Sequence, residues 1–105
     1  MATGTIESPR ELVFGKSFNP VYKNTSYTNL NTLATNEFDG SGKQFVMLDN
    51  AATIDGCGWC NRNIILGWLN AAKTYGYLVV IGFGGIYYAF RNNASSFTIR
   101  TVASA

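Results

Sequence analysis

The alternation of hydrophobic and polar residues is clearest in the last third of the chain. Residues 76–83 (GYLVVIGF) are apolar at nearly every position, which predicts a strand with both faces buried. Residues 86–91 and 97–101 follow with apolar side chains at every second position, the period of a half-buried strand. Between the first two runs, Gly84-Gly85 predicts a two-residue hairpin turn. These runs predict a three-strand antiparallel meander.

Two apolar stretches precede the meander and differ in period. Residues 44–48 form a short compact run that predicts a strand. In residues 63–72 the apolar positions fall at helical spacing, although Gly67 and Asn70 are poor residues for a helix interior. The spacing predicts one short helix at about 63–72. The apolar positions behind that prediction are Ile64, Ile65, Trp68, Leu69 and Ala72.

The chain changes character near Gly40. Residues 1–39 are polar and irregular, with a short strand predicted around Leu12–Phe14. The Asn- and Thr-rich stretch 21–36 shows no helical face, and we predict a strand or an extended wrap for it. Residues 40–105 are predicted to form the globular domain. The expected fold class is mainly β, an antiparallel sheet or sandwich that ends in the meander.

Composition narrows the function classes. The 105 residues are 47% hydrophobic and only 13% charged, about half the usual charged fraction of roughly 25%. Asn, Thr, Ser and Gly must therefore cover the surface, which is common in extracellular adhesins and viral surface proteins. The same profile suits a subunit that hides apolar surface against neighbours. The net charge is +2 with scattered basic residues, so we expect no nucleic-acid partner.

Targeting signals are also missing from the sequence as given. No run approaches the roughly 18 apolar residues of a membrane helix, so no membrane insertion is expected. The first residues lack a basic stretch followed by an apolar one, and no signal peptide is predicted. We therefore expect synthesis in a cytoplasm.

Cys57 and Cys60 form the sharpest local motif, IDGCGWC. A Cys-x-x-Cys pair before a helix is the thioredoxin arrangement, in which the helix N-terminus lowers a thiol pKa. A long loop before the motif and the placement of both prolines, Pro9 and Pro20, far upstream argue against it. Zinc needs four ligands, and the chain offers two thiols and no histidine. We favour two semi-buried thiols in a turn, with thiol–disulfide chemistry kept as an alternative.

Other catalytic groups are not grouped in the sequence. The absence of histidine removes the usual general base and a common metal ligand. The six Asp and Glu residues are spread over predicted loops and strand ends and form no evident pair. We therefore predict no catalytic residue, no metal site and no cofactor.

Residues 76–101 carry a family resemblance. A glycine-led apolar strand, a tight turn, the strand IYYAFR, a polar turn at 92–96 and a closing strand resemble the C-terminal modules of phage tail fibres and pyocin-type knobs. The Asn/Thr-rich stretch upstream is similar too, whereas the tryptophan frequent in the last strand of the family is replaced by residues 97–100. The resemblance implies homotrimers on a virion surface that bind bacterial polysaccharide or protein receptors without covalent chemistry. Residues 1–39 would then wrap the domain or lead to a shaft.

Exposed aromatic and amide side chains suggest where a glycan would bind. Aromatic rings stack on sugar faces, while amide and guanidinium groups hydrogen bond to hydroxyls. Trp59 lies among loop residues, and the Asn pair lies at a predicted turn. The candidate ligand-binding residues are Trp59, Asn61, Arg62, Arg91, Asn92 and Asn93. The alternatives to a glycan-binding fibre tip are the redox protein above and a structural virion subunit without a ligand site.

Overall fold

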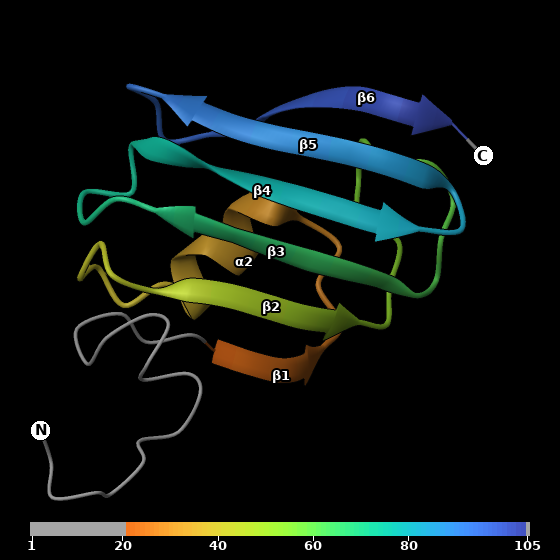
Figure 1. Cartoon of the computed structure of the whole chain (residues 1–105), viewed down its shortest axis with the longest axis horizontal. Helices are drawn as coiled ribbons and strands as arrows, with labels where there is room; N and C mark the ends of the chain where they lie inside the picture. The colour runs from red at the N-terminus through yellow and green to blue at the C-terminus, as the bar shows by residue number, and fades with distance from the viewer. Residues whose placement is uncertain (1–20, 105) are drawn as a thin grey trace, which may run out of the picture.

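The computed structural model describes residues 21–104, which form one six-stranded sheet and one helix. The strands lie in the sheet in the order in which they occur along the chain (Figure 1). β1 is parallel to β2, and every later pair is antiparallel. The elements are β1 (Val21–Thr25), α2 (Leu30–Glu37), β2 (Phe45–Asn50), β3 (Asn63–Leu69), β4 (Tyr75–Gly82), β5 (Gly85–Asn92) and β6 (Thr98–Ser104).

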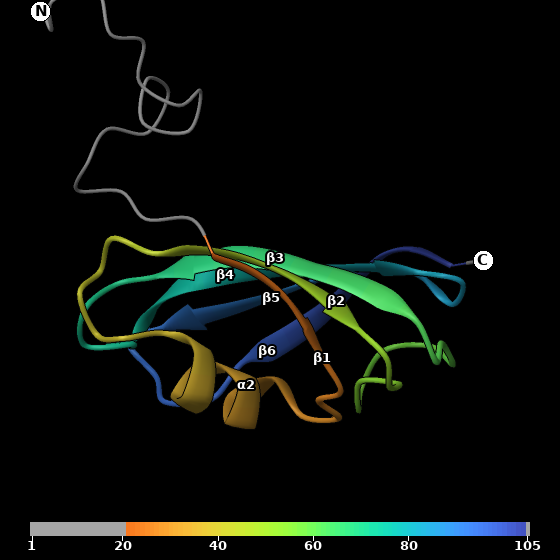
Figure 2. The same ribbon diagram turned by 90° about the horizontal axis from the view of Figure 1, so that it is seen from below.

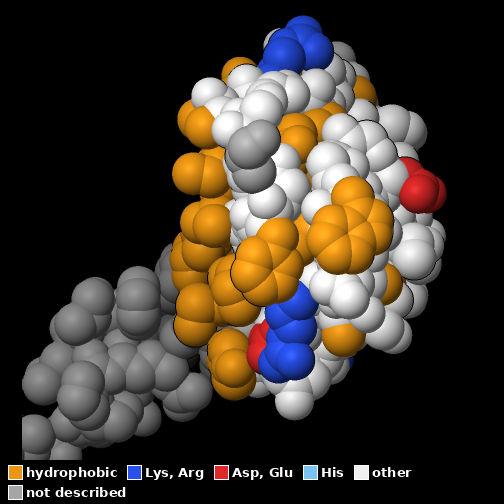
Figure 3. Space-filling model, turned by 90° about the vertical axis from the view of Figure 1, so that its right-hand side faces the viewer, with side chains coloured by type: hydrophobic (Ala, Val, Ile, Leu, Met, Phe, Trp, Pro, Cys, Tyr) orange, Lys and Arg blue, Asp and Glu red, His pale blue; other side chains and the backbone are white. Residues whose placement is uncertain are grey.

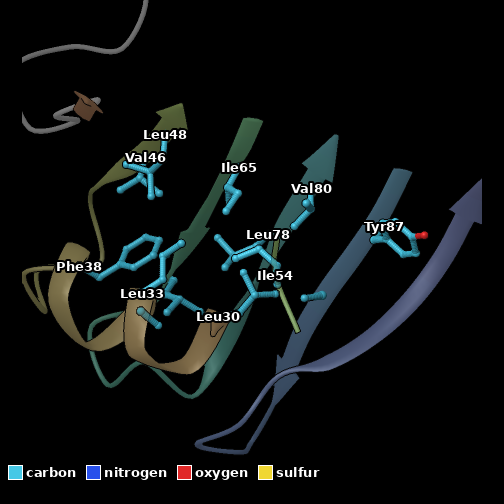
Figure 4. Close-up of a cluster of buried hydrophobic side chains, with 13 residues drawn as sticks. Leu30, Leu33, Phe38, Val46, Leu48, Ile54, Ile65, Leu78, Val80 and Tyr87 are labelled. Atoms are coloured by element: carbon cyan, nitrogen blue, oxygen red, sulfur yellow. The ribbon is translucent and has the colours of Figure 1, made fainter. Parts of the chain in front are cut away.

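The core lies between α2 and one face of the sheet. Figure 2 shows α2 lying against a single face, while the opposite face has no described element over it. In Figure 4, side chains from α2, the sheet and the β2–β3 loop meet in one cluster. The largest fully buried apolar side chains of this cluster are Leu33, Leu48, Ile54, Ile65, Leu69, Leu78 and Val46.

The mainly β prediction is confirmed, and the meander is its most accurate part. β4, β5 and β6 are the predicted strands. The turn differs by one residue, because Gly82 pairs with Gly85 and leaves Phe83-Gly84 at the tip. Gly84 is pressed against the β2–β3 loop, since a Cβ there would lie 2.7 Å from the carbonyl carbon of Gly58. Contact with the β2–β3 loop therefore requires a glycine at position 84 of the turn.

The helix predicted at 63–72 is wrong, because β3 occupies most of that stretch. β3 carries apolar residues on both of its faces. Some of these residues therefore fall at the spacing expected of a helix. Ile65 and Leu69 are fully buried on the α2 side, while Leu66 and Trp68 lie on the opposite face of the sheet. A Cβ at Gly67 would overlap the carbonyl oxygen of Tyr77 in the adjacent β4, so glycine is required by strand pairing.

The helix is found instead at α2, where the sequence was read as lacking a helical face. The Asn29 side chain caps it by accepting hydrogen bonds from the backbone N–H groups of Asn31 (2.8 Å) and Thr32 (3.2 Å). The buried residues recur at helical spacing: Leu30, Leu33, Ala34 and Glu37. The apolar residues of α2 form only a narrow stripe among Asn and Thr residues. For that reason the sequence pattern did not reveal a helix.

β1 and α2 precede Gly40, yet β1 adds a strand to the sheet and α2 contributes to the core, so the expected irregular segment contributes structure from residue 21 onward. The buried Glu37 joins them. Its carboxylate pairs with Lys23 Nζ at 2.7 Å and accepts a hydrogen bond from Tyr27 Oη at 2.5 Å. The strand predicted at Leu12–Phe14 lies outside the described residues.

A buried asparagine fixes the chain between β1 and α2. Asn50, fully buried at the end of β2, accepts hydrogen bonds from Tyr27 N–H (2.6 Å) and Thr25 Oγ1 (2.9 Å). Its Nδ2 donates to the carbonyl oxygens of Tyr27 and Ala52, both at 2.9 Å. One amide thus satisfies backbone groups that leave the sheet there.

Candidate functional site

The β2–β3 loop and the β4–β5 turn lie at the same end of the sheet (Figure 1), and each carries an exposed aromatic side chain. Trp59 is 72% exposed and Phe83 is 70% exposed. Their backbones lie together, because a Cβ at Gly84 would be 2.7 Å from the carbonyl oxygen of Trp59. The Phe83 N–H also donates to Cys60 Sγ at 3.0 Å. The two rings therefore extend from segments that are held against each other.

An ion pair lies at the same end. The Arg62 guanidinium binds the Asp49 carboxylate through two hydrogen bonds, Nε–Oδ1 at 3.0 Å and Nη2–Oδ2 at 2.8 Å. These hydrogen bonds lower the pKa of Asp49 below its ordinary value and raise the pKa of Arg62. Both groups therefore stay charged at neutral pH. Arg62 is exposed, so the pair presents donors and acceptors to solvent.

A groove of about 430 Å³ runs from this pair toward the turn. A second hollow of about 220 Å³ lies on the β1 side and shares both charged residues with the groove. Figure 3 looks onto this end of the molecule and shows hydrophobic side chains beside a pair of opposite charges. The groove is lined by Asp49, Arg62, Asn63, Ile64, Ile81, Gly82 and Phe83.

The six residues expected to bind a ligand lie at two ends of the sheet. Trp59, Asn61 and Arg62 are exposed at the end just described. Asn92, by contrast, pairs with Tyr75 at the start of β4, whereas the groove adjoins Gly82 at its end. At about 3.3 Å per residue, the two ends are about 23 Å apart. A single small ligand cannot contact both groups.

Arg91 and Asn93 belong to the far end and serve the fold there. Arg91 is only 7% exposed, and its guanidinium donates to Lys73 O (2.7 Å) and to Asn31 Oδ1 (3.2 Å). It also lies 4.4 Å from the centre of the Phe97 ring. Burial lowers the pKa of Arg91. Asn93 adopts a positive φ of 53° in the β5–β6 connection, as expected for asparagine in a turn.

Asp49 and Phe83 were missed as candidates. Asp49 looked like one of several scattered carboxylates, and only strand pairing brings it opposite Ile64 in β3 and within reach of Arg62. Phe83 looked like the end of a buried strand, although it occupies the exposed tip of the turn. A large apolar residue beside a turn glycine was the available signal.

The two cysteines carry free thiols and help to hold the site in place. Cys60 is buried, contacts the carbonyl oxygen of Arg62 and accepts the Phe83 N–H. Burial raises the pKa of Cys60, but hydrogen bonds with the backbone of Arg62, Gly84 and Phe83 outweigh it and the net shift is downward. Burial raises the pKa of Cys57 to about 11. The motif precedes strand β3, so it has no helix N-terminus to activate a thiol.

The thiol of Cys57 should therefore be unreactive at neutral pH. In a Cys60→Ser variant, the rate of alkylation by iodoacetamide should rise only as the pH approaches about 11. Because the folded state keeps a proton that the unfolded state releases near pH 9, stability should fall between these two pH values. The urea-unfolded variant is the control and should react with a midpoint near pH 9. A folded-state midpoint near pH 7, with reduction of insulin by the wild type, would restore the redox alternative.

Other site chemistry and the comparisons add little. Between residues 21 and 104, no three His, Cys, Asp or Glu side chains gather in a way that could hold a metal ion. Within the same range, no helix is long and apolar enough to cross a membrane. Searches against protein-family models, curated proteins and solved structures find no match to the chain.

Proposed function

We propose that this chain is a non-enzymatic recognition domain that binds a carbohydrate at the Trp59–Phe83 end of its sheet. The observation that carries the proposal is a groove lined by the exposed Phe83 and the solvent-facing Arg62–Asp49 ion pair, with the exposed Trp59 on the adjoining loop. Exposed aromatic residues on loops are costly in water and usually serve recognition.

The chemistry of this end suits a sugar. A pyranose ring has an apolar face of C–H groups that stacks on an aromatic ring, and its edge carries hydroxyl groups. Those hydroxyls can donate to the Asp49 carboxylate and accept from the Arg62 guanidinium. Because the loop is tied to the turn through Cys60, little side-chain and loop entropy is lost on binding.

The wider setting of the proposal comes from the resemblance of residues 76–101 to fibre-tip modules. It makes the chain the receptor-binding part of a phage or phage-like fibre, located on a particle surface and facing a bacterial glycan. The homotrimer implied by the same resemblance stays a prediction. A structural virion subunit without a ligand site is the second candidate, and a glycan-binding measurement separates the two.

Single substitutions of the two rings should weaken glycan binding. Ligands are first found on an array of bacterial polysaccharides, and affinities are then measured by calorimetry. Trp59→Ala and Phe83→Ala should each reduce the affinity about tenfold or more, the equivalent of about 1.4 kcal/mol. Tyr75→Ala is the matched control, because Tyr75 is 46% exposed at the opposite end of the sheet and should leave the affinity unchanged.

Two results would count against the glycan proposal. An array without any ligand would favour the structural subunit. A ligand whose affinity falls with Tyr75→Ala but not with Trp59→Ala would place the binding site at the other end of the sheet.

A further inference from the structure

Apolar side chains cover most of the sheet face opposite α2, which also carries Asp49, opposite Ile64, and Arg100, opposite Tyr88. Residues paired across neighbouring strands lie on the same face, so the strand registers define its rows. One row crosses β1 to β5 and consists of Tyr22, Met47, Leu66, Val79 and Tyr88. The rows on either side contain Trp68, Tyr77 and Phe90, and Ile64, Ile81 and Ile86. We name these eleven residues the open face.

Several of these side chains are unusually exposed for their type. Tyr77 is 64% exposed, Tyr22 is 63% exposed and Ile81 is 43% exposed. The opposite side of the same strands is buried, with Leu78 and Val80 at 3% exposure or less. The sheet thus has two apolar faces, of which α2 covers only one.

The side chains of the open face indicate what kind of surface can cover it. Its eleven residues include no charged side chain, and the nearest charges lie at its borders, on Arg100 of β6 and in the Asp49–Arg62 pair. The Trp68 indole N–H already donates to the carbonyl oxygen of Gly42 at 2.8 Å, so this ring requires no polar partner. A complementary surface must therefore be apolar, flat and uncharged.

The size of the open face is that of a protein interface. With about 4.8 Å between strands and about 3.3 Å per residue, it projects about 500 Å² before side-chain relief is counted. Because the side chains protrude from the sheet, the accessible area is larger and approaches about 800 Å², which is the area that each partner contributes to a standard interface. Two such sheets pack face to face at about 10 Å, as in a β-sandwich.

We propose that the open face is the surface through which copies of this chain pack against one another. The eleven residues are uncharged, and the Asp49 carboxylate in the row of Ile64 is neutralised by Arg62, so the approach of a second copy opposes few like charges. Residues 1–20 are the other candidate occupant within the chain. Their apolar side chains are few and include only three consecutive large ones, Leu12–Phe14, against eleven on the face. A second copy of the chain offers eleven such residues, the same number as the face to be covered.

Charged substitutions at the centre of the open face should separate the copies. Light scattering of the full chain should give a mass that is a multiple of 11.5 kDa. Tyr77→Glu and Ile81→Glu should each weaken association about thirtyfold or more, as expected at an interface centre. Circular dichroism should show both variants folded, because both side chains are exposed in the single copy. Trp59→Glu is the matched control and should leave the mass unchanged.

A wild-type chain that is monomeric at about 100 µM overturns the proposal, whatever covers the face instead. So does a Tyr77→Glu variant that keeps the wild-type mass. Ile64 and Ile81 belong to the open face and also line the groove, so Tyr77→Glu, which lies outside the groove, is the variant that tests the interface separately from the glycan site. A dissociated Tyr77→Glu variant that still binds glycan supports both, while an assembled wild type that binds no glycan supports the interface and rejects the proposed function.

Discussion

An Asn50→Leu variant is expected to lose about 4 kcal/mol of unfolding free energy, measured by urea denaturation. Leucine has the same number and branching of side-chain heavy atoms, but all four hydrogen bonds of the buried amide disappear. The backbone N–H and carbonyl groups of Tyr27 would be left without their amide partner. Each buried polar group that loses its partner costs about 1–3 kcal/mol. For a domain of ordinary stability, about 5–15 kcal/mol, the loss is large.

Two further variants separate the hydrogen bonds from other effects. Asn50→Asp keeps the acceptor oxygen but turns the Nδ2 donor into a carboxylate oxygen facing the carbonyls of Tyr27 and Ala52. It should be destabilised at pH 7 and should partly recover near pH 4, where the acid can donate. Asn61→Leu, on the exposed loop, should change stability by less than about 0.5 kcal/mol. A loss below about 1 kcal/mol for Asn50→Leu would mean that the amide is not an anchor.

Arg91→Ala is expected to cost about 3 kcal/mol, again by urea denaturation. Arg91 joins three segments, because it contacts Lys73 before β4, Asn31 in α2 and Phe97 before β6. The loss combines two charge-assisted hydrogen bonds with the packing of the stem on the ring. The ion pairs between residues 21 and 104 are Lys23–Glu37 and Arg62–Asp49, so no described carboxylate offsets this buried charge.

Arg91→Met tests how that cost is divided. Methionine keeps the apolar stem and removes a buried charge, including an Nε that has no described hydrogen-bond partner. We expect it to lose about half as much as Arg91→Ala. Arg100→Ala is the control, because Arg100 is exposed and its guanidinium lies over Phe90 at 5.6 Å, an interaction worth about 0.5–1 kcal/mol. If Arg91→Ala is as mild as Arg100→Ala, the far end of the sheet does not depend on this residue.

The meander was predictable because its information is local. β4 and β5 alternate between buried and more exposed side chains, and glycine or asparagine separates the strands of the meander. The two errors in secondary structure depend on distant partners. β3 became a strand because β2 and β4 pair with it on both sides, and α2 forms because its narrow apolar stripe meets the sheet. A single-sequence pattern contains neither partner.

The candidate site shows the same limit. Trp59 and Arg62 were identified from exposure cues in the sequence, since loop position and side-chain chemistry suffice for that. Asp49 and Phe83 reach the site only through strand register and turn geometry. Arg91 was included because it is close in sequence to the exposed candidates, although its neighbours in space close over it. Which residues share an end of a sheet is a property of topology and cannot be obtained from proximity along the chain.

The agreement between strand order and chain order has a kinetic consequence. From β3 onward each strand pairs antiparallel with the one made just before it, so these pairings close comparatively short loops and cost little chain entropy. Proteins with such local contacts fold faster than β-sandwiches whose neighbouring strands are distant in sequence. The β1–β2 pair is the exception and should form more slowly, because the two strands are parallel and α2 connects them. The hairpins from β2 to β6 should therefore assemble first, and the β1–α2 segment should dock onto a preformed sheet.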